Sequence, residues 1–378
     1  MSDQSKRLFF LAALIFLLIR LATPALGQEI IKENEKGGQE GEDKRWGVVL
    51  LPVIFYMPET KWGGGVGGLL TYHPVRSSRR SRPSSLYFYA IYTQLKQFST
   101  QARPELYLRN EAYLITAKIV AETFPDKFWG LGNETLDEAE EKFTPQSLSL
   151  EASWQKKIWP TQNFYAGFSV LLENYKIVKL EAGKMLEKQI YAGSRGGTTT
   201  SFGAILNWDT RDNIFFPREG HYYQLMACIS RRFLASDFDT TSVKCDLRKY
   251  IPLLSGHTLA WQILFQAVGG EAPFKNYSKF GGDSIMRGYY SGRYRDRYLF
   301  ALQGEYRLPL WKRFGLVAFA GVGDVSSRLR NFRLDQFKYS FGFGLRFKVA
   351  PKEGTNLRLD FAWGKRSSGF YFTAGEAF

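Results

Sequence analysis

The stretch FKYSFGFGLRFKV, residues 337–349, alternates between apolar and polar side chains with a period of two. One face carries apolar and aromatic side chains: Tyr339, Phe341, Phe343, Leu345, Phe347 and Val349. The other carries small or charged ones: Lys338, Ser340, Gly342, Gly344, Arg346 and Lys348. Successive side chains of a β-strand point to opposite faces of the sheet. The stretch therefore predicts a strand with one apolar face and one wet face.

The same alternation recurs over residues 148–157, 201–209 and 356–364. A soluble β-sandwich would also alternate, so strand length and the polar face have to decide between the two architectures. The alternating segments run for about ten to twelve residues, which suits a tilted crossing of a bilayer. Their polar faces carry Lys, Arg, Asp and Glu, as the water-filled interior of a membrane barrel does. The pattern favours a transmembrane β-barrel.

The composition agrees with a β protein rich in glycine and aromatic residues. The 378 residues are 44% hydrophobic and include 36 Gly, 31 Phe, 21 Tyr and 9 Trp. Outside the N-terminus no run of about 18 apolar residues could form a membrane-spanning helix. Two Cys and three His are too few for a disulfide scaffold or a His/Cys zinc site.

The N-terminus predicts export. Lys6 and Arg7 precede an apolar segment over residues 8–19, and the small-residue stretch Ala25-Leu26-Gly27 follows. This order predicts a signal peptide over residues 1–27. A membrane anchor is the weaker alternative, because about twelve apolar residues cannot span a bilayer. Residues 28–45 are charged and Gly-rich, which predicts a disordered periplasmic tail, and residues 46–378 are assigned to the barrel.

Counting the segments gives an all-β protein, a 16-stranded antiparallel transmembrane β-barrel of the bacterial outer membrane. An even number of strands places both termini on the periplasmic side. The longer connections, 123–143, 177–198 and 270–296, all follow odd-numbered strands and are therefore expected on the outer side.

The sequence gives no sign of an enzyme, a cofactor or a metal site. The glycine run over residues 63–68 lacks the following helix and acidic residue of a dinucleotide-binding loop, and is better explained as a closely packed strand. No Gly-x-Ser-x-Gly or His-Glu-x-x-His motif occurs. The net charge of +15 is spread along an exported chain, so nucleic acid is not an expected partner. Anionic outer-membrane lipids, or a basic water-filled lumen, account for the charge better.

The richest motif lies in the longest outer connection. It consists of Gly281, Gly282, Ile285, Met286, Arg287, Gly288 and Tyr289. It resembles the signature loop of the BamA/TamA superfamily of outer-membrane proteins, also called the bacterial surface antigen barrel. Residues 209–220, 342–360 and 370–378 match the same family in order, so the resemblance covers about residues 46–378.

The resemblance implies an outer loop that folds back into the lumen, where Arg287 meets acidic residues of the wall. Carried over, these would be Glu305 and Asp324. Glu305 shares the polar face of its strand with Gln303 and Arg307, and Asp324 lies opposite Val317 and Phe319, which we expect to turn it inward. The contact between Arg287 and these carboxylates has two possible roles. It could serve solely to hold the loop in place and help the barrel fold, or it could take part in transport as well.

The family also suggests roles for the two ends of the barrel. Phe370, Phe372 and Phe378 resemble the C-terminal signal by which the barrel assembly machinery recognises its clients. Pro52, which cannot donate a ladder hydrogen bond, and Gly375 mark a weakly paired seam between the first and last strands. Alternatively, Pro52 faces its hairpin partner and the seam is unaffected.

The resemblance implies a role in inserting proteins or lipids into the outer membrane, or in translocating them across it. Members of this type carry periplasmic polypeptide-transport-associated (POTRA) domains, for which residues 28–45 leave no room, so a short member reduced to the barrel is expected. Possible partners are client barrel proteins or a separate periplasmic protein. The alternatives are a passive pore for small, preferentially anionic solutes, and a structural barrel that acts with such a periplasmic partner.

Overall fold

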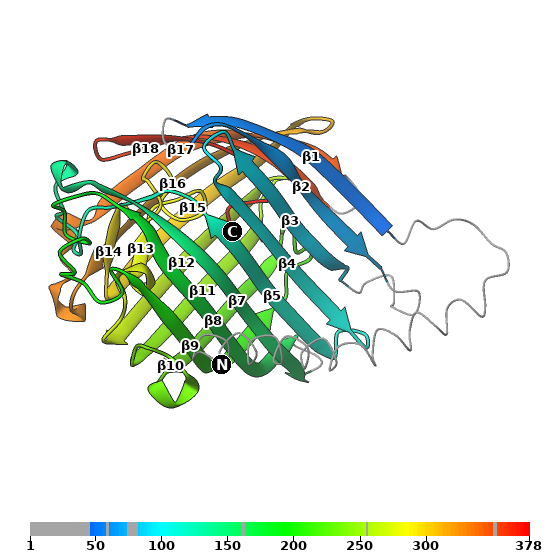
Figure 1. Ribbon diagram of the computed structural model, residues 1–378. Helices are drawn as coiled ribbons and strands as arrows, with labels where there is room; N and C mark the ends of the chain where they lie inside the picture. Colours follow the sequence, from blue (N-terminus) through cyan, green and yellow to red (C-terminus); the bar gives the residue numbers. More distant parts are fainter. Residues whose placement is uncertain (1–45, 58–59, 74–81, 160–162, 255, 351–353) are drawn as a thin grey trace.

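The computed structural model describes residues 46–57, 60–73, 82–159, 163–254, 256–350 and 354–378. The predicted signal peptide and periplasmic tail lie outside the described residues. Within them, no helix is long and apolar enough to cross a bilayer. The chain is built almost entirely of long antiparallel strands (Figure 1).

Sixteen strands pair antiparallel, each with the next along the chain. They are β1 (Trp46–Met57), β2 (Lys61–Tyr72), β3 (Ser84–Thr93), β4 (Phe98–Leu108), β5 (Tyr113–Thr123), β7 (Glu141–Trp159), β8 (Phe164–Leu180), β9 (Gly196–Asp209), β10 (Gly220–Ser230), β11 (Thr240–Pro252), β12 (Thr258–Gly270), β15 (Tyr298–Trp311), β16 (Phe314–Ser326), β17 (Lys338–Ala350), β18 (Thr355–Gly364) and β19 (Ser367–Ala374).

The described residues contain nineteen strands, where the sequence predicted sixteen. The three additional strands have three residues each: β6 (Asp126–Phe128), β13 (Ser278–Phe280) and β14 (Tyr294–Asp296). β6 pairs with β7 beyond the end of β5, and β13 pairs with β14. All three lie in connections that are expected on the outer side, and they are too short to show alternation.

The sheet curls round on itself, but a closed ladder is not observed. Figure 1 shows β1 running beside the C-terminal strands, and Cα atoms of β1 come within 8 Å of β17. Across the residues that the structure describes, no ladder joins β1 to β19. The expected closure of the barrel is therefore not shown.

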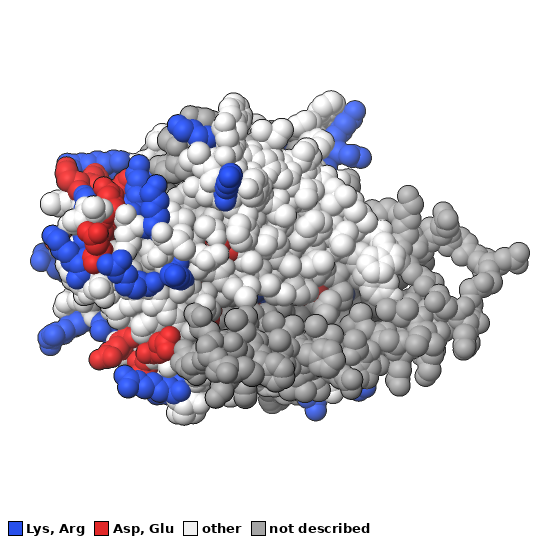
Figure 2. All heavy atoms as spheres, viewed as in Figure 1, with Lys and Arg blue, Asp and Glu red and all other residues white. Residues whose placement is uncertain are grey.

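The polarity of the wall is the inverse of that of a soluble protein. On β17, Phe341, Phe343 and Leu345 are 44–50% exposed on the outside, whereas the intervening Arg346 is 3% exposed on the inside. Figure 2 shows the consequence, a broad uncharged surface around the middle of the molecule, with charged side chains gathered at the end where β13 and β14 lie. The predicted alternation is confirmed.

The glycine run lies within β2, as a closely packed strand. A Cβ atom on Gly65 would lie 2.0 Å from the carbonyl oxygen of Ala90 on β3. Only glycine permits this close approach of two backbones.

The outer connections cover the mouth of the lumen. They carry five short 3₁₀ segments: η1 (Asp137–Ala139), η3 (Arg232–Leu234), η4 (Phe274–Asn276), η5 (Leu329–Asn331) and η6 (Leu334–Gln336). A buried cluster joins several of these connections: Phe128, Phe143, Tyr175, Ile177, Leu186 and Phe274. Arg295 on β14 binds Asp126 on β6 at 3.2 Å. This ion pair joins the two longest connections, β5–β7 and β12–β15.

The inverted polarity makes a prediction for two adjacent residues of β10. Leu225 is 45% exposed on the outer face, and Met226 lines a cavity of the lumen. Leu225→Arg should lower the free energy of unfolding by about 2–4 kcal/mol, because lipid cannot solvate the guanidinium. Met226→Arg should cost clearly less, since the cavity admits water. Urea unfolding in lipid vesicles measures both, and equal losses would contradict this assignment of faces.

Candidate functional site

The lumenal loop, residues 281–293, starts directly after β13 and turns into the lumen. Gly281 and Gly282 have φ angles of +97° and +131°, which L side chains rarely adopt. A Cβ on Gly281 would also lie 2.3 Å from the carbonyl oxygen of Tyr290. The paired glycines thus allow the sharp entry into the loop.

Arg287 is the anchor of the lumenal loop. Its side chain is 1% exposed, and its Nη2 donates to Glu305 Oε1 at 2.6 Å while Nη1 donates to Asp360 Oδ2 at 2.5 Å. The guanidinium carbon lies 3.5 Å from the centre of the Phe319 ring. The planar fork of arginine can serve two carboxylates and stack on a ring at once, which lysine cannot do. Residues of β15, β16 and β18 thereby meet at one side chain.

The structure corrects the second expected partner of Arg287. Asp324 does not contact Arg287; it accepts from Lys338 Nζ at 2.6 Å and from Asn133 Nδ2 at 2.8 Å. Alternation did not orient Asp324 as expected either, because Val317 and Phe319 are buried on the lumenal face instead of facing lipid. Asp360 takes the position that the sequence analysis gave to Asp324.

The ion pairs around Arg287 continue along the inner wall. Glu305 also binds Arg307 at 2.8 Å, and Asp360 also binds Arg346 at 2.6 Å. Such a network has to be well bonded, since removing an ion from water costs several kcal/mol. Four buried arginines share three buried carboxylates here: Arg287, Arg307, Arg346 and Arg358 with Glu305, Asp360 and Glu376.

The backbone of the lumenal loop is bonded to the last strands of the sheet. Gly288 N donates to the Tyr371 hydroxyl at 2.9 Å, and the Ser367 hydroxyl donates to Gly288 O at 2.6 Å. Both partners lie on β19. Ser340 on β17 donates to Arg287 O, and Met286 N donates to Gln303 Oε1 on β15 at 3.1 Å. The lumenal loop therefore fixes β15–β19 as one block.

Apolar contacts also hold the lumenal loop against the wall. Met286 and Tyr289 are buried in a cluster with Leu264, Phe280, Leu299, Ala301 and Val325, against which Ile285 also packs. The Tyr289 ring lies flat on Gly364, where a Cβ atom would come within 2.3 Å of the ring. Its hydroxyl accepts from Lys365 N at 2.6 Å and donates to Tyr339 O at 2.8 Å. The five motif residues 285–289 thus pack on the inner wall, whereas Gly281 and Gly282 lie against the loop's own Tyr290 and Ser291.

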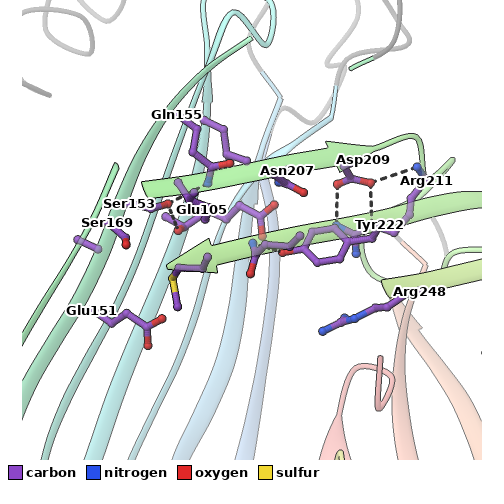
Figure 3. A pocket seen from close by; sticks show the side chains of 16 residues that line it. Glu105, Glu151, Ser153, Gln155, Ser169, Asn207, Asp209, Arg211, Tyr222 and Arg248 are labelled. Atoms are coloured by element: carbon purple, nitrogen blue, oxygen red, sulfur yellow. Dashed lines mark hydrogen bonds and ion pairs between the residues drawn. The ribbon is translucent and has the colours of Figure 1, made fainter. Parts of the chain in front are cut away.

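The other half of the lumen contains open space. A cavity of about 290 Å³ lies against β4, β5 and β7–β11 (Figure 3). Its labelled lining is polar throughout: Glu105, Glu151, Ser153, Gln155, Ser169, Asn207, Asp209, Arg211, Tyr222 and Arg248. Two neighbouring cavities, of about 330 and 530 Å³, share lining residues with it. The N-terminal half of the wall thus borders a polar space, which also reaches β18 and β19, whereas the lumenal loop packs against β15–β19.

The two sides of the cavity carry charges of both signs. Asp209 binds Arg211 at 2.8 Å and Arg82 at 3.2 Å, and Arg248 binds Asp246 at 2.7 Å. The side-chain amide oxygens of Gln155 and Asn207 are buried without a hydrogen-bond partner among the described residues. The cavity therefore presents both hydrogen-bond donors and acceptors.

The seam residues lie at the two edges of the sheet. Pro52 is opposite Val66 in the β1–β2 ladder, and Gly375, with a φ of +86°, ends β19. After Gly375 the chain turns into the lumen. Whether this seam opens stays a prediction.

The C-terminal aromatic residues do not share one environment. Phe370 and Phe372 are each 60% exposed on the lipid-facing side, whereas Phe378 is 4% exposed and packs inside against Tyr250 and Ala260. The alternation suggested that Phe378 continues the outer face of β19, and the structure shows that it does not. Its carbonyl oxygen accepts from Arg307 Nη2 at 2.9 Å. Recognition of these residues by the assembly machinery stays a prediction.

Three members of the network were not predicted from the sequence: Asp360, Arg346 and Glu376. A signal for Asp360 was present, because it shares the polar face of its strand with Arg358. No local pattern could show Glu376, since its place depends on the turn at Gly375. Glu376 lies beyond β19 and binds Arg346 at 2.8 Å and Asn356 at 2.7 Å.

Removal of Arg287 should destabilise the protein more than removal of an exposed arginine. In Arg287→Ala, Glu305 and Asp360 keep Arg307 and Arg346, so we expect a loss of about 3 kcal/mol, at the lower end for a broken buried pair. Arg330→Ala, on the exposed η5, should change stability by less than about 0.5 kcal/mol. Urea unfolding followed by tryptophan fluorescence compares them. Equal stability of the two variants would contradict the role of Arg287 as the anchor.

The contribution of Glu376, in the C-terminal residues after β19, to stability should depend on pH. Burial alone would raise the pKa of the Glu376 carboxyl, but the Arg346 and Arg307 guanidiniums lower it below its usual value. Glu376 therefore stabilises the folded state above its unfolded pKa of about 4.3, and this contribution is lost as pH falls through the folded pKa. Unfolding at pH 7 and at pH 3 should show a smaller difference for Glu376→Gln than for the wild type. The same pH dependence in both would exclude this tail contact as a contributor.

The comparisons with known proteins agree with this architecture. The model of the Omp85 superfamily domain matches residues 137–378. The fold is similar to that of "BamA from Haemophilus ducreyi lacking POTRA domains 1-3", with a TM-score of 0.55 at 12% identity over 87% of this chain and 69% of that chain. It is also similar to CdiB from Acinetobacter baumannii, with a TM-score of 0.52 at 10% identity over 88% and 60%.

At such identities the solved structures show the fold alone, and this chain spans only part of the length of either. No curated protein matches the sequence. The family assignment rests on the domain match, which covers more than half of the chain and includes the lumenal loop and its partners. The chain belongs to the Omp85 superfamily and is an outer-membrane protein.

Proposed function

We propose that this protein inserts proteins into the outer membrane, or translocates them across it, through the space between β1 and the lumenal loop. The observation that carries the proposal is the asymmetry of the sheet. β19 is bonded to the lumenal loop through Ser367 and Tyr371. β1 is paired along one edge only, to β2, in the part of the chain that the structure describes.

A strand with one unpaired edge offers its N–H and C=O groups to another strand. On β1 this edge accompanies strongly exposed apolar side chains: Val48, Leu50 and Ile54 are 58–77% exposed. An incoming strand with an apolar and a polar face would find lipid on one side and the polar cavities on the other. The substrate class that fits best is therefore a client polypeptide in extended form, and the reaction needs no catalytic residue or cofactor.

The passive-pore alternative has less support. The outer mouth is covered by connections that pack on one another around Phe128 and Phe274. Acidic as well as basic side chains line the cavity of Figure 3, among them Glu105, Glu151 and Arg248, which gives little support to a preference for anions. A structural barrel that acts with a separate periplasmic protein would need that protein for any activity.

Locking the seam tests the proposal. After Cys228 and Cys245 are replaced by Ser, cysteine pairs are introduced with one residue in 48–51 of β1 and one in 370–373 of β19, and pairs that a short bis-maleimide joins are retained. Purified protein in liposomes is assayed for assisted folding of a client barrel and for solute efflux. The joined variants should lose most of the client folding, because β1 can no longer accept a strand.

The matched control joins β1 to β2 through Val49→Cys and Leu69→Cys, which already face each other in the ladder. This link should leave client folding unchanged. Full client folding with the β1–β19 seam locked would refute the proposed route. Efflux without any client folding would favour the pore, and activity only after addition of a periplasmic extract would favour the structural barrel.

A further inference from the structure

A crevice at the periplasmic end of the sheet is lined by five cationic side chains. They come from segments far apart in the sequence, namely the β9–β10 turn, β15, the β15–β16 turn and β17: Arg218, Arg307, Arg313, Arg346 and Lys348. The other lining residues are apolar side chains, glycines and Asn356, and among the described residues that line the crevice none is acidic. This crevice is separate from the lumenal loop and from the cavity of Figure 3.

The carboxylates of the inner wall do not neutralise these cations. Arg307 binds Glu305, and Arg346 binds Asp360 and Glu376, but Glu305 and Asp360 are shared with Arg287. Within the described part of the chain, Arg218, Arg313 and Lys348 form no ion pair. Among the described residues, three cations at the crevice are therefore left without a carboxylate.

Two further observations point to a missing anion. Arg346 is 3% exposed, yet its Nη2 has no hydrogen-bond partner in the described part of the chain, and a buried unpaired donor is costly. In addition, Arg218 and Lys348 line the same crevice, so their like charges repel each other. A bound anion would pair with the free donor and relieve the repulsion.

The rim of the crevice indicates the source of the anion. Phe314 lines it and is 46% exposed, and Leu310 and Trp311 in the same turn are 56% and 65% exposed. Exposed tryptophan and leucine next to Lys312 and Arg313 are typical of the level where lipid head groups meet water. Basic pockets at this level bind phosphorylated head groups.

We propose that the mouth of the crevice between the β9–β10 turn, the β15–β16 turn and β17 binds the phosphate group of a phospholipid from the periplasmic leaflet, with one phosphate oxygen entering the enclosed space of about 20 Å³. Arg313 and Lys348 approach the phosphate from the turn and the wall, and Arg346 Nη2 donates to one of its oxygens. The acyl chains lie outside, along Phe314 and Leu316. The site goes beyond the proposed transport function and would persist if that function were wrong.

The test uses the full chain purified in detergent, with bound lipid measured by native mass spectrometry. Wild-type protein should retain phosphatidylglycerol at least tenfold more strongly than diacylglycerol, which lacks the phosphate. The double variant Arg313→Gln/Lys348→Gln should lose this preference by at least tenfold. Both residues lie outside the Arg287 network, and an unchanged urea midpoint verifies that the variant is folded.

Lys312→Gln is the matched control, because Lys312 lies in the same turn, stacks on Trp311 at 4.5 Å and does not line the crevice. It should keep the wild-type preference. Retention of phosphatidylglycerol by the double variant would overturn the proposal. Titration with inorganic phosphate, followed by ³¹P NMR, separates the sources: binding of free phosphate without binding of the lipid would overturn the assignment to phospholipid.

Discussion

The buried guanidinium of Arg287 is the contact on which the interior of this protein depends. It lies on a loop that enters from the outer side, yet it bonds to carboxylates on β15 and β18 and stacks on a ring of β16. A buried charge has to be paired, so the loop and the three strands constrain one another. The hydrogen bonds to β17 and β19 extend this constraint to the edge of the sheet. One half of the wall is thereby bonded to the loop, and polar cavities border the other half and reach β18 and β19.

This division of the lumen follows from the alternation of the strands. Each strand has to place every second side chain toward lipid, which leaves the intervening positions for the interior. In β15–β19 these positions carry Arg, Glu, Asp and small residues, which form ion pairs and leave room for the loop. In β7–β10 they carry Ser, Gln, Asn and Glu, which border open space. The asymmetry of the lumen therefore follows from the inward-facing residues.

The sequence predicted the features that arise from local patterns and missed those that depend on distant turns. Alternation over residues 337–349 was sufficient to find β17 and to orient Arg346 inward. The same reasoning placed Glu305 correctly beside Gln303 and Arg307, but it misplaced Asp324, because Val317 and Phe319 were taken for lipid-facing residues. An aromatic residue beneath a buried arginine breaks the rule that apolar residues of a barrel face lipid. The three-residue strands and the pairing of the two sheet edges are likewise set by tertiary contacts.

The turn at Gly375 changes which of the C-terminal aromatic residues are accessible before and after folding. In the unfolded chain Phe370, Phe372 and Phe378 are all accessible, but after folding Phe378 lies inside, against Tyr250, and Arg307 holds its carbonyl oxygen. A receptor that reads all three aromatic rings together could bind the chain only before it folds. Folding would then bury Phe378 and so release the receptor without any other energy source. The inward turn would thus make assembly a one-way process.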